Sequence, residues 1–162
     1  MAIKQGDRLP DATLLEMGED GPASVRLAER LAGRRVVVFG LPGAFTGTCT
    51  TAHVPSFVRT AAEFRAKGVE EIICLAVNDP FVMRAWSDQT GAGEAGITHL
   101  ADPAAEFTKA AGMAFTAPPV GFYDRSKRYA LLAEDGVVSV LQIDDNPGTC
   151  DLSGGESLLA AL

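Results

Sequence analysis

The 162-residue sequence predicts an α/β fold in which a central mixed β-sheet is flanked by helices. Two uninterrupted apolar runs, at 36–40 and 72–77, carry no polar alternation, which is typical of strands buried on both faces of a sheet. A helical pattern of apolar residues occupies 50–67 between them. Hydrophobic residues make up 47 % and charged residues 22 % of the chain, which is ordinary globular composition.

Short elements are expected ahead of the first central strand. Residues 11–17 favour a short strand or hairpin, and the glycines and proline within 18–22 indicate a turn. Residues 27–31 have the pattern of a short helix. After the first central strand, residues 41–46 are predicted to form a loop that leads into the long helix.

The elements expected after the second central strand are a helix over 81–90, a strand over 99–102, a helix over 104–111, a hairpin of 129–133 and 137–143, and a C-terminal helix over 157–162. The order strand, helix, strand, helix, β-hairpin and final helix is the plan of a thioredoxin-like fold. No repeat, charge block or low-complexity linker interrupts it, so we expect a single domain over 1–162.

Charge and hydropathy argue against several functional classes. The net charge of −7 disfavours a broad basic face for nucleic acid or an anionic membrane. No stretch approaches the ~20 apolar residues of a membrane span, and the N-terminus has no apolar signal core. Three cysteines do not make a disulfide scaffold in a chain of this length, which indicates a reducing compartment. We expect a cytoplasmic protein, or an organellar one if a transit peptide has been removed.

The chemically unusual segment is PGAFTGTC at 42–49, between the first central strand and the long helix. Cys49 stands where free backbone N–H groups and the positive end of the helix dipole stabilise a thiolate. Thr46 places a hydroxyl near the sulfur if the loop wraps around it. A lone cysteine could equally be a buried, inert residue. The position of Cys49 between a strand, a loop and a helix favours a nucleophile instead.

This segment, with HVP at 53–55, resembles the active-site motif of the peroxiredoxins, in their type V subfamily, called type II in plants. The resemblance extends over most of the chain in the family's order. Its further blocks are CLAVNDPFVM at 74–83, Trp86, LADP at 100–103, RSKRY at 125–129 and EDGVV at 134–138.

The resemblance implies a thioredoxin-like fold, a homodimer, and thiol-dependent reduction of hydrogen peroxide and organic hydroperoxides with neither metal nor flavin. Carried over by position, Cys49 is the peroxidatic nucleophile and Thr46 its partner in T-x-x-C. Pro42 shields the pocket, and Arg128 matches the family's active-site arginine; without the resemblance, Arg128 would be assigned as a surface residue. The apolar residues within 81–86 are either a dimer contact, as the resemblance suggests, or core.

Two positions depart from the family pattern. Gly47 stands where the family usually has proline, and we expect it to loosen the loop. Ser56 stands where glycine is common, with little expected effect.

Thiolate character alone contributes little to the rate of such a reaction. A thiol of pKa ~8.5 is only about 3 % ionised at pH 7, so lowering the pKa to roughly 6 raises the thiolate fraction about 30-fold. The intrinsic nucleophilicity of the thiolate falls with its basicity, which lowers its rate of attack about 10- to 20-fold. We therefore expect the rate to depend on orienting the peroxide and stabilising the departing oxygen, through Thr46, the Cys49 N–H and Arg128.

The sulfenic acid that forms on Cys49 must meet a second thiol. Cys150 follows NPGT at 146–149, which predicts an exposed and mobile loop. Cys74 lies in a buried strand and would need local unfolding to react. We favour Cys150 as the resolving residue, with Cys74 and direct reduction by thioredoxin, glutaredoxin or glutathione left open.

Three other functions compete. A disulfide reductase needs a C-x-x-C pair, which is absent. A cysteine hydrolase would use His53, four residues after Cys49, as its base, although a packing or hydrogen-bonding role for His53 is favoured. A non-enzymatic peroxide sensor would oxidise at Cys49 without turnover by a thiol reductant.

Overall fold

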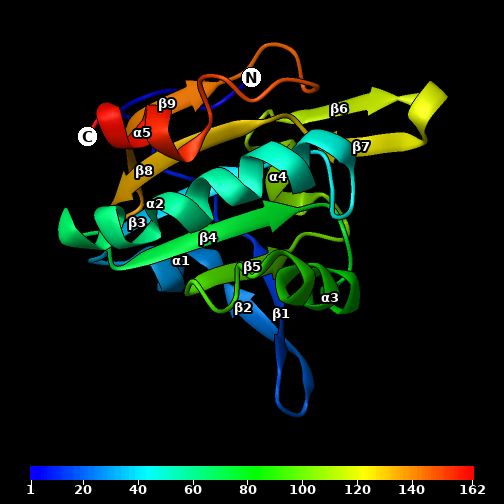
Figure 1. Cartoon of the computed structure of the whole chain (residues 1–162), viewed down its shortest axis with the longest axis horizontal. Helices are drawn as coiled ribbons and strands as arrows, with labels where there is room; N and C mark the ends of the chain where they lie inside the picture. Colours follow the sequence, from blue (N-terminus) through cyan, green and yellow to red (C-terminus); the bar gives the residue numbers. More distant parts are fainter.

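The computed structural model describes all 162 residues, and its main feature is a mixed seven-stranded sheet (Figure 1). The strand order is β2-β1-β5-β4-β3-β8-β9. The strands are β1 (Thr13–Gly18), β2 (Gly21–Arg26), β3 (Arg35–Gly40), β4 (Glu71–Ala76), β5 (Ile97–Ala101), β8 (Tyr129–Glu134) and β9 (Val137–Ile143). β4 is parallel to β3 and β5, and all other neighbours are antiparallel. The predicted central mixed sheet is thus confirmed.

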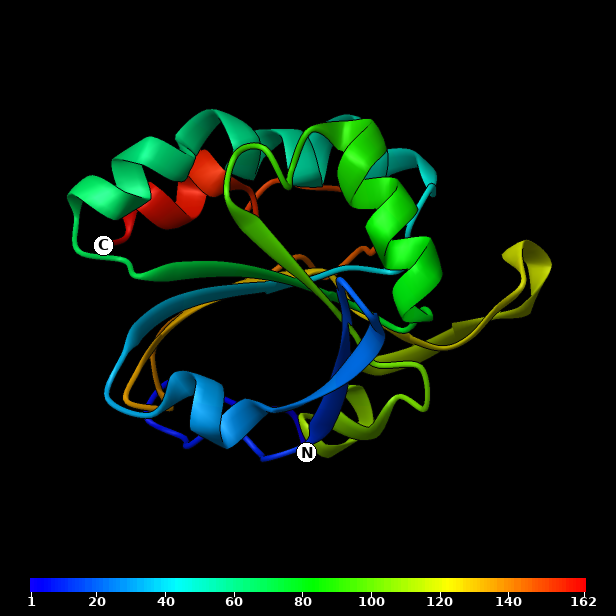
Figure 2. The same ribbon diagram turned by 90° about the horizontal axis from the view of Figure 1, so that it is seen from below.

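Helices cover both faces of this sheet (Figure 2). One layer holds α2 (Val54–Ala66), α3 (Pro80–Thr90) and α5 (Gly155–Ala160), and the other holds α1 (Leu27–Leu31) and α4 (Glu106–Ala110). Alternate residues of β3 enter the two cores: Phe39 packs under the first layer and Val38 under the second. Because both faces are buried, the central strands are apolar throughout, as their sequence indicated.

The long helix predicted over 50–67 is divided. It opens with a π-helical turn, η1 (Cys49–His53), in which the Val54 N–H donates to the Cys49 carbonyl, and continues as α2. Pro55 follows the turn and has no N–H to donate to it. Single π-turns of this kind are frequent at functional sites.

Two strands lie outside the predicted set. β6 (Ala114–Ala117) and β7 (Phe122–Ser126) pair only with each other, across the short 3₁₀ turn η2 (Pro118–Val120), and the arm extends from the body of the molecule (Figure 2). Both strands are short and only partly buried, so the alternation that identifies a strand from sequence is weak.

The N-terminal hairpin is longer than predicted. The turn expected over 18–22 is confined to 19–20, and the second strand runs over Gly21–Arg26. This strand is mostly exposed at the sheet edge, so its sequence carries little apolar signal. The C-terminal helix, expected from 157, begins at Gly155.

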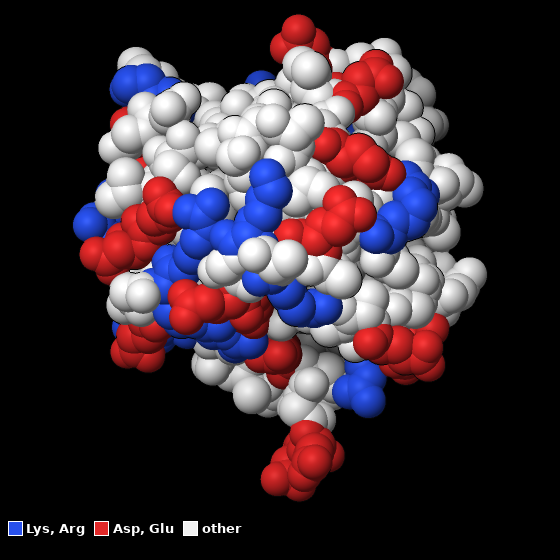
Figure 3. Space-filling model, turned by 60° about the vertical axis from the view of Figure 1, so that its left-hand side comes forward, with Lys and Arg blue, Asp and Glu red and all other residues white.

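The surface carries mixed charge. Acidic and basic side chains are interspersed over the face drawn in Figure 3. None of the helices combines the length and the apolar character that crossing a membrane needs.

Gly40, the last residue of β3, makes room for the buried ring of Tyr129 on β8. A Cβ at this position would overlap the ring, so we expect Gly40→Ala to lower the free energy of unfolding by about 1–3 kcal/mol, as overpacking does. Urea denaturation measures the change. Gly47→Ala is the matched control, since a Cβ at Gly47 meets no atom; equal stability of the two variants would contradict the packing argument.

Candidate active site

Cys49 lies at the end of the sheet where β3 gives way to the long helix. β3 ends at Gly40, a loop over 41–48 follows, and Cys49 is the first residue of the π-turn. Its side chain is fully buried and belongs to the core beneath α2 and α3. The cysteine thus has the strand–loop–helix setting that the sequence predicted.

Arg128 reaches Cys49 through the pairing of β8 with β3. The register sets Tyr129 opposite Gly40, and Arg128 immediately precedes Tyr129. The side chain is 1 % exposed, and its Nη2 donates to Cys49 Sγ at 3.2 Å. No carboxylate forms an ion pair with it. A guanidinium stays protonated in proteins, so a fixed positive charge faces the sulfur.

The Pro147 carbonyl holds the same guanidinium from the other side. It accepts hydrogen bonds from Arg128 Nε at 3.0 Å and from Nη2 at 2.8 Å. Pro147 belongs to the loop that follows β9, so two distant segments meet at Arg128.

His53, at the end of the π-turn, is fully buried and links Arg128 to the same loop. Its Nδ1 lies 3.0 Å from Arg128 Nη1, and its Nε2 lies 2.9 Å from the Ser153 carbonyl oxygen. Arginine only donates and a carbonyl only accepts, so the ring is the neutral tautomer with the proton on Nε2.

This tautomer excludes His53 as a base for Cys49. Burial, reinforced by the charge of Arg128, lowers the pKa of His53 to about 3. Its only acceptor nitrogen is occupied by Arg128. The hydrogen-bonding role favoured from the sequence is confirmed, and the Cys–His pair of a hydrolase is not formed.

Thr46 and Pro42 line the mouth of the site. Thr46 Oγ1 donates to the Gly43 carbonyl at 2.7 Å, so its proton is engaged and its lone pairs are free to accept. The Pro42 carbonyl accepts from Arg125 Nη1 at 3.0 Å, and the Arg125 guanidinium lies over the Phe122 ring at 5.2 Å. Arg125 therefore fixes the loop, a role that the sequence motif does not reveal.

A cavity of about 440 Å³ opens at this point. Arg128, Thr46 and Pro42 contribute to it together with Pro147. Its apolar wall comes from the arm of β6 and β7, through Phe115, Ala117, Val120 and Phe122. Sequence reasoning missed this wall; the phenylalanines on either side of the Pro-Pro turn were the available signal.

The loop after β9 is fastened rather than free. Asp144, which is 4 % exposed, accepts hydrogen bonds from the N–H groups of Asp151, Leu152 and Ser153. These bonds and that from the Ser153 hydroxyl lower the pKa of Asp144 against the opposing effect of burial. Thr48 Oγ1 adds a bond to the Gly148 carbonyl at 2.8 Å.

Cys150 is therefore half-buried, although Asn146, Gly148 and Thr149 in the loop before it are exposed, as predicted. Burial raises the pKa of its thiol, although the Ser153 hydroxyl, 4.0 Å from Sγ, and Arg128 oppose the effect. The sequence could not show that the loop is held in place, because the groups that hold it are mostly backbone atoms brought together by the fold.

Cys74 lies in the middle of β4, fully buried, as predicted. It shares a core with Cys49, and burial, followed by the neighbouring Cys49, raises the pKa of its thiol. All three cysteines are free.

The apolar residues of 81–86 differ in how far they are buried. Met83 and Trp86 are core, Val82 is partly buried, and Phe81 is 65 % exposed. Phe45, in the active-site loop, is also exposed.

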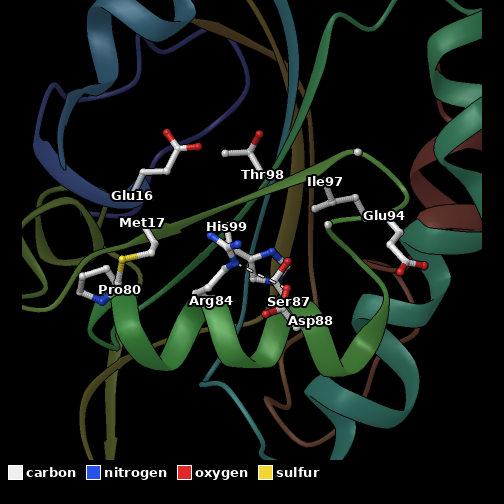
Figure 4. Close-up of a pocket in the computed structure, with 12 residues that line it drawn as sticks. Glu16, Met17, Pro80, Arg84, Ser87, Asp88, Glu94, Ile97, Thr98 and His99 are labelled. Carbon is white, nitrogen blue, oxygen red and sulfur yellow. Dashed lines mark ion pairs between the residues drawn. The ribbon is translucent and has the colours of Figure 1, made fainter. Parts of the chain in front are cut away.

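A larger hollow lies elsewhere. A groove of about 680 Å³ between α3 and β5 is lined by Arg84, Asp88 and His99 among others, and Arg84 pairs with Asp88 at 3.5 Å (Figure 4). No predicted site residue lines it, so size alone does not identify the functional pocket.

Comparison with known proteins finds related sequences and structures. The Redoxin family model matches residues 4–159. The chain is 46 % identical to Peroxiredoxin-2E-2, chloroplastic, of Oryza sativa subsp. japonica, over 99 % of this chain and 72 % of that protein. It is 42 % identical to Peroxiredoxin-2C of the same plant, over 99 % and 98 %. Reduced Prx3 from Vibrio vulnificus in complex with H2O2 has a TM-score of 0.92 at 41 % identity and 98 % coverage of both chains.

We expect Asp144→Asn to loosen the loop and speed the reaction of Cys150 with a thiol reagent. The pKa of Asp144 is lowered in the folded protein. The carboxylate therefore stabilises the loop fully above the usual pKa of a carboxyl group, and this stabilisation is lost as the pH falls through the lower folded pKa. The reaction is followed in a Cys49→Ser background, where Cys150 is the least buried thiol. Asp145→Asn, at the exposed neighbour, should leave the rate unchanged; an equal rise in both variants would refute the role of Asp144.

Proposed function

The chain belongs to the peroxiredoxin family and is a thiol-dependent peroxidase, and on this basis we propose that Cys49, Arg128, Thr46 and Pro42 form its peroxide-reducing centre. One observation carries the proposal: a buried guanidinium, unpaired with any carboxylate, donates to Cys49 Sγ at 3.2 Å. A cation in this position suits a reaction in which negative charge moves from sulfur to oxygen.

In the proposed reaction, the Cys49 sulfur attacks one peroxide oxygen and the O–O bond breaks. The other oxygen takes up the proton that the thiol gave up and leaves as water or alcohol, while Cys49 becomes a sulfenic acid. Arg128 is not the acid, since it does not deprotonate. It stabilises charge on the departing oxygen and holds the peroxide in line.

Thr46 supplies the complementary contact. Because its hydroxyl proton is engaged by the Gly43 carbonyl, Oγ1 accepts a hydrogen bond from the peroxide O–H. Donation from Arg128 and acceptance by Thr46 together orient the hydroperoxide for attack by the sulfur. Pro42, buried and held by Arg125 through its carbonyl, shields the site.

The cavity suits more than hydrogen peroxide. Its volume, about 440 Å³, and its apolar wall on β6 and β7 leave room for an alkyl group beyond the O–O bond. We infer that both hydrogen peroxide and organic hydroperoxides are substrates.

Cys150 is proposed to resolve the sulfenic acid. Its thiol would condense with the oxidised Cys49 to form a disulfide and release water. Thioredoxin, glutaredoxin or glutathione would then reduce this bridge by thiol–disulfide exchange. The loop carrying Cys150 already contacts the site, through Pro147 at Arg128 and Ser153 at His53, whereas Cys74 is held in a central strand.

We also propose that residues 1–162 act as one domain and that two copies associate. Exposed Phe45 and Phe81 give the apolar surface for that contact beside the active-site loop. Free cysteines suit a reducing compartment, whether the cytoplasm or an organelle.

Stopped-flow oxidation tests the centre. The single tryptophan, Trp86, donates to Thr50 Oγ1 at 3.1 Å, one residue from Cys49, so its fluorescence should follow oxidation. We expect Cys49→Ser to abolish the fast change with hydrogen peroxide, and Arg128→Lys to slow it about 100-fold, the usual effect of losing a preorganised donor. Lys127→Ala, at the exposed neighbour, is the control. Equal rates for wild type and Cys49→Ser would end the proposal.

Mass spectrometry identifies the resolving thiol. After one equivalent of peroxide we expect a Cys49–Cys150 bridge, which persists in Cys74→Ser and gives way to a trappable sulfenic acid in Cys150→Ser. A Cys49–Cys74 bridge, or no bridge at all, would contradict the choice of Cys150.

A further inference from the structure

His53 is a fully buried titratable group that takes no direct part in the peroxide chemistry. We propose that it is a positioning residue that couples Arg128 to the loop 144–154, so that the guanidinium is held against the sulfur while the loop is closed and is released when the loop leaves. The proposal rests on the function proposed above and assigns this residue a role in ordering the two chemical steps.

The two hydrogen bonds of the ring form a chain. Arg128 Nη1 donates to Nδ1 at 3.0 Å, and Nε2 donates to the Ser153 carbonyl at 2.9 Å. Each bond favours the tautomer that the other needs, because a proton on Nε2 leaves Nδ1 free to accept. In a buried chain of this kind each hydrogen bond polarises the next.

The loop holds Arg128 by two routes. The Pro147 carbonyl accepts from Nε and Nη2 directly, and the Ser153 carbonyl acts through His53 on Nη1. The guanidinium has one further hydrogen-bond partner, Cys49 Sγ, which accepts from Nη2. Every hydrogen bond of the guanidinium other than that to the sulfur therefore leads to the loop, directly or through the histidine.

The closed loop favours attack, and the open loop favours resolution. Cys49 and Cys150 are not bonded to each other, so forming the bridge requires the segment between Pro147 and Ser153 to shift. In the proposed coupling, this shift draws away from their donors the two carbonyls that now accept from Arg128 and His53. Arg128 then loses its fixed orientation only after the step that needs it.

Packing is the competing explanation for His53. Its ring centroid lies 5.1 Å from that of Phe39 and 5.7 Å from that of Phe57. His53→Phe keeps this aromatic packing and removes both hydrogen bonds, so it isolates the polar role.

Two amide variants separate the two bonds. In His53→Asn the amide oxygen takes the place of Nδ1 and can accept from Arg128, but the side chain is too short to donate to the Ser153 carbonyl. In His53→Gln the amide nitrogen takes the place of Nε2 and can donate to Ser153, without an acceptor beside Arg128.

Two rates are measured on each variant: peroxide attack, from Trp86 fluorescence, and the reaction of Cys150 with a thiol reagent in a Cys49→Ser background. We expect His53→Phe to slow attack at least about ten-fold and to speed Cys150 labelling at least about three-fold, as loss of buried hydrogen bonds does. His53→Asn should recover most of the attack rate with labelling still fast. His53→Gln should show slow attack with labelling near the wild-type rate.

Equal changes in both rates for the Asn and Gln variants would overturn the coupling and leave His53 a packing residue. The labelling rate requires no peroxidase activity, so failure of the coupling is distinguishable from failure of the proposed function, in which wild type itself shows no fast attack.

If the histidine variants do not fold, Asp144→Asn tests the coupling from the loop side, with Asp145→Asn as control. Asp144 contacts the loop N–H groups and does not line the cavity. We expect faster Cys150 labelling together with slower peroxide attack. Faster labelling with unchanged attack would refute the proposal.

Discussion

The site depends on a buried guanidinium that has no carboxylate partner. Removing Arg128 from water is unfavourable unless its N–H groups find acceptors, and the fold supplies a sulfur, a histidine nitrogen and a backbone carbonyl. Because the histidine nitrogen and the backbone carbonyl are neutral and no carboxylate pairs with Arg128, its positive charge is directed at the sulfur and the substrate. A carboxylate in the same place would stabilise the arginine but weaken its effect on the reacting oxygen.

The sheet makes this arrangement possible. Antiparallel pairing of β3 with β8 places Tyr129 opposite Gly40, which brings Arg128 to the strand end from which the Cys49 loop departs. A one-residue slip in this register would turn Arg128 to the other face of the sheet. This register needs glycine at position 40, since a Cβ there would overlap the Tyr129 ring.

In the proposed mechanism, the loop after β9 allows one pocket to serve both peroxide attack and resolution. Its carbonyls orient Arg128 while Asp144 holds its N–H groups, so the segment that carries Cys150 is part of the wall of the reduced site. A resolving residue that was fully mobile would leave Arg128 without restraint, whereas one locked in a strand, such as Cys74, could not move without disrupting the sheet.

The sequence by itself determined the central sheet, the position of Cys49 ahead of a helix, and the family motif, because long apolar runs and short-range spacing are local properties. It missed the arm of β6 and β7, whose short, half-exposed strands carry little periodicity, and it did not reveal the hydrogen bonds from Asp144 that hold the loop around Cys150. Only the tertiary structure decided the contacts of Arg128, the tautomer of His53 and the fastening of the 144–154 loop. Each joins residues far apart in the chain, often through backbone carbonyls and N–H groups, which are the same in every sequence and acquire specificity only from their position in the fold.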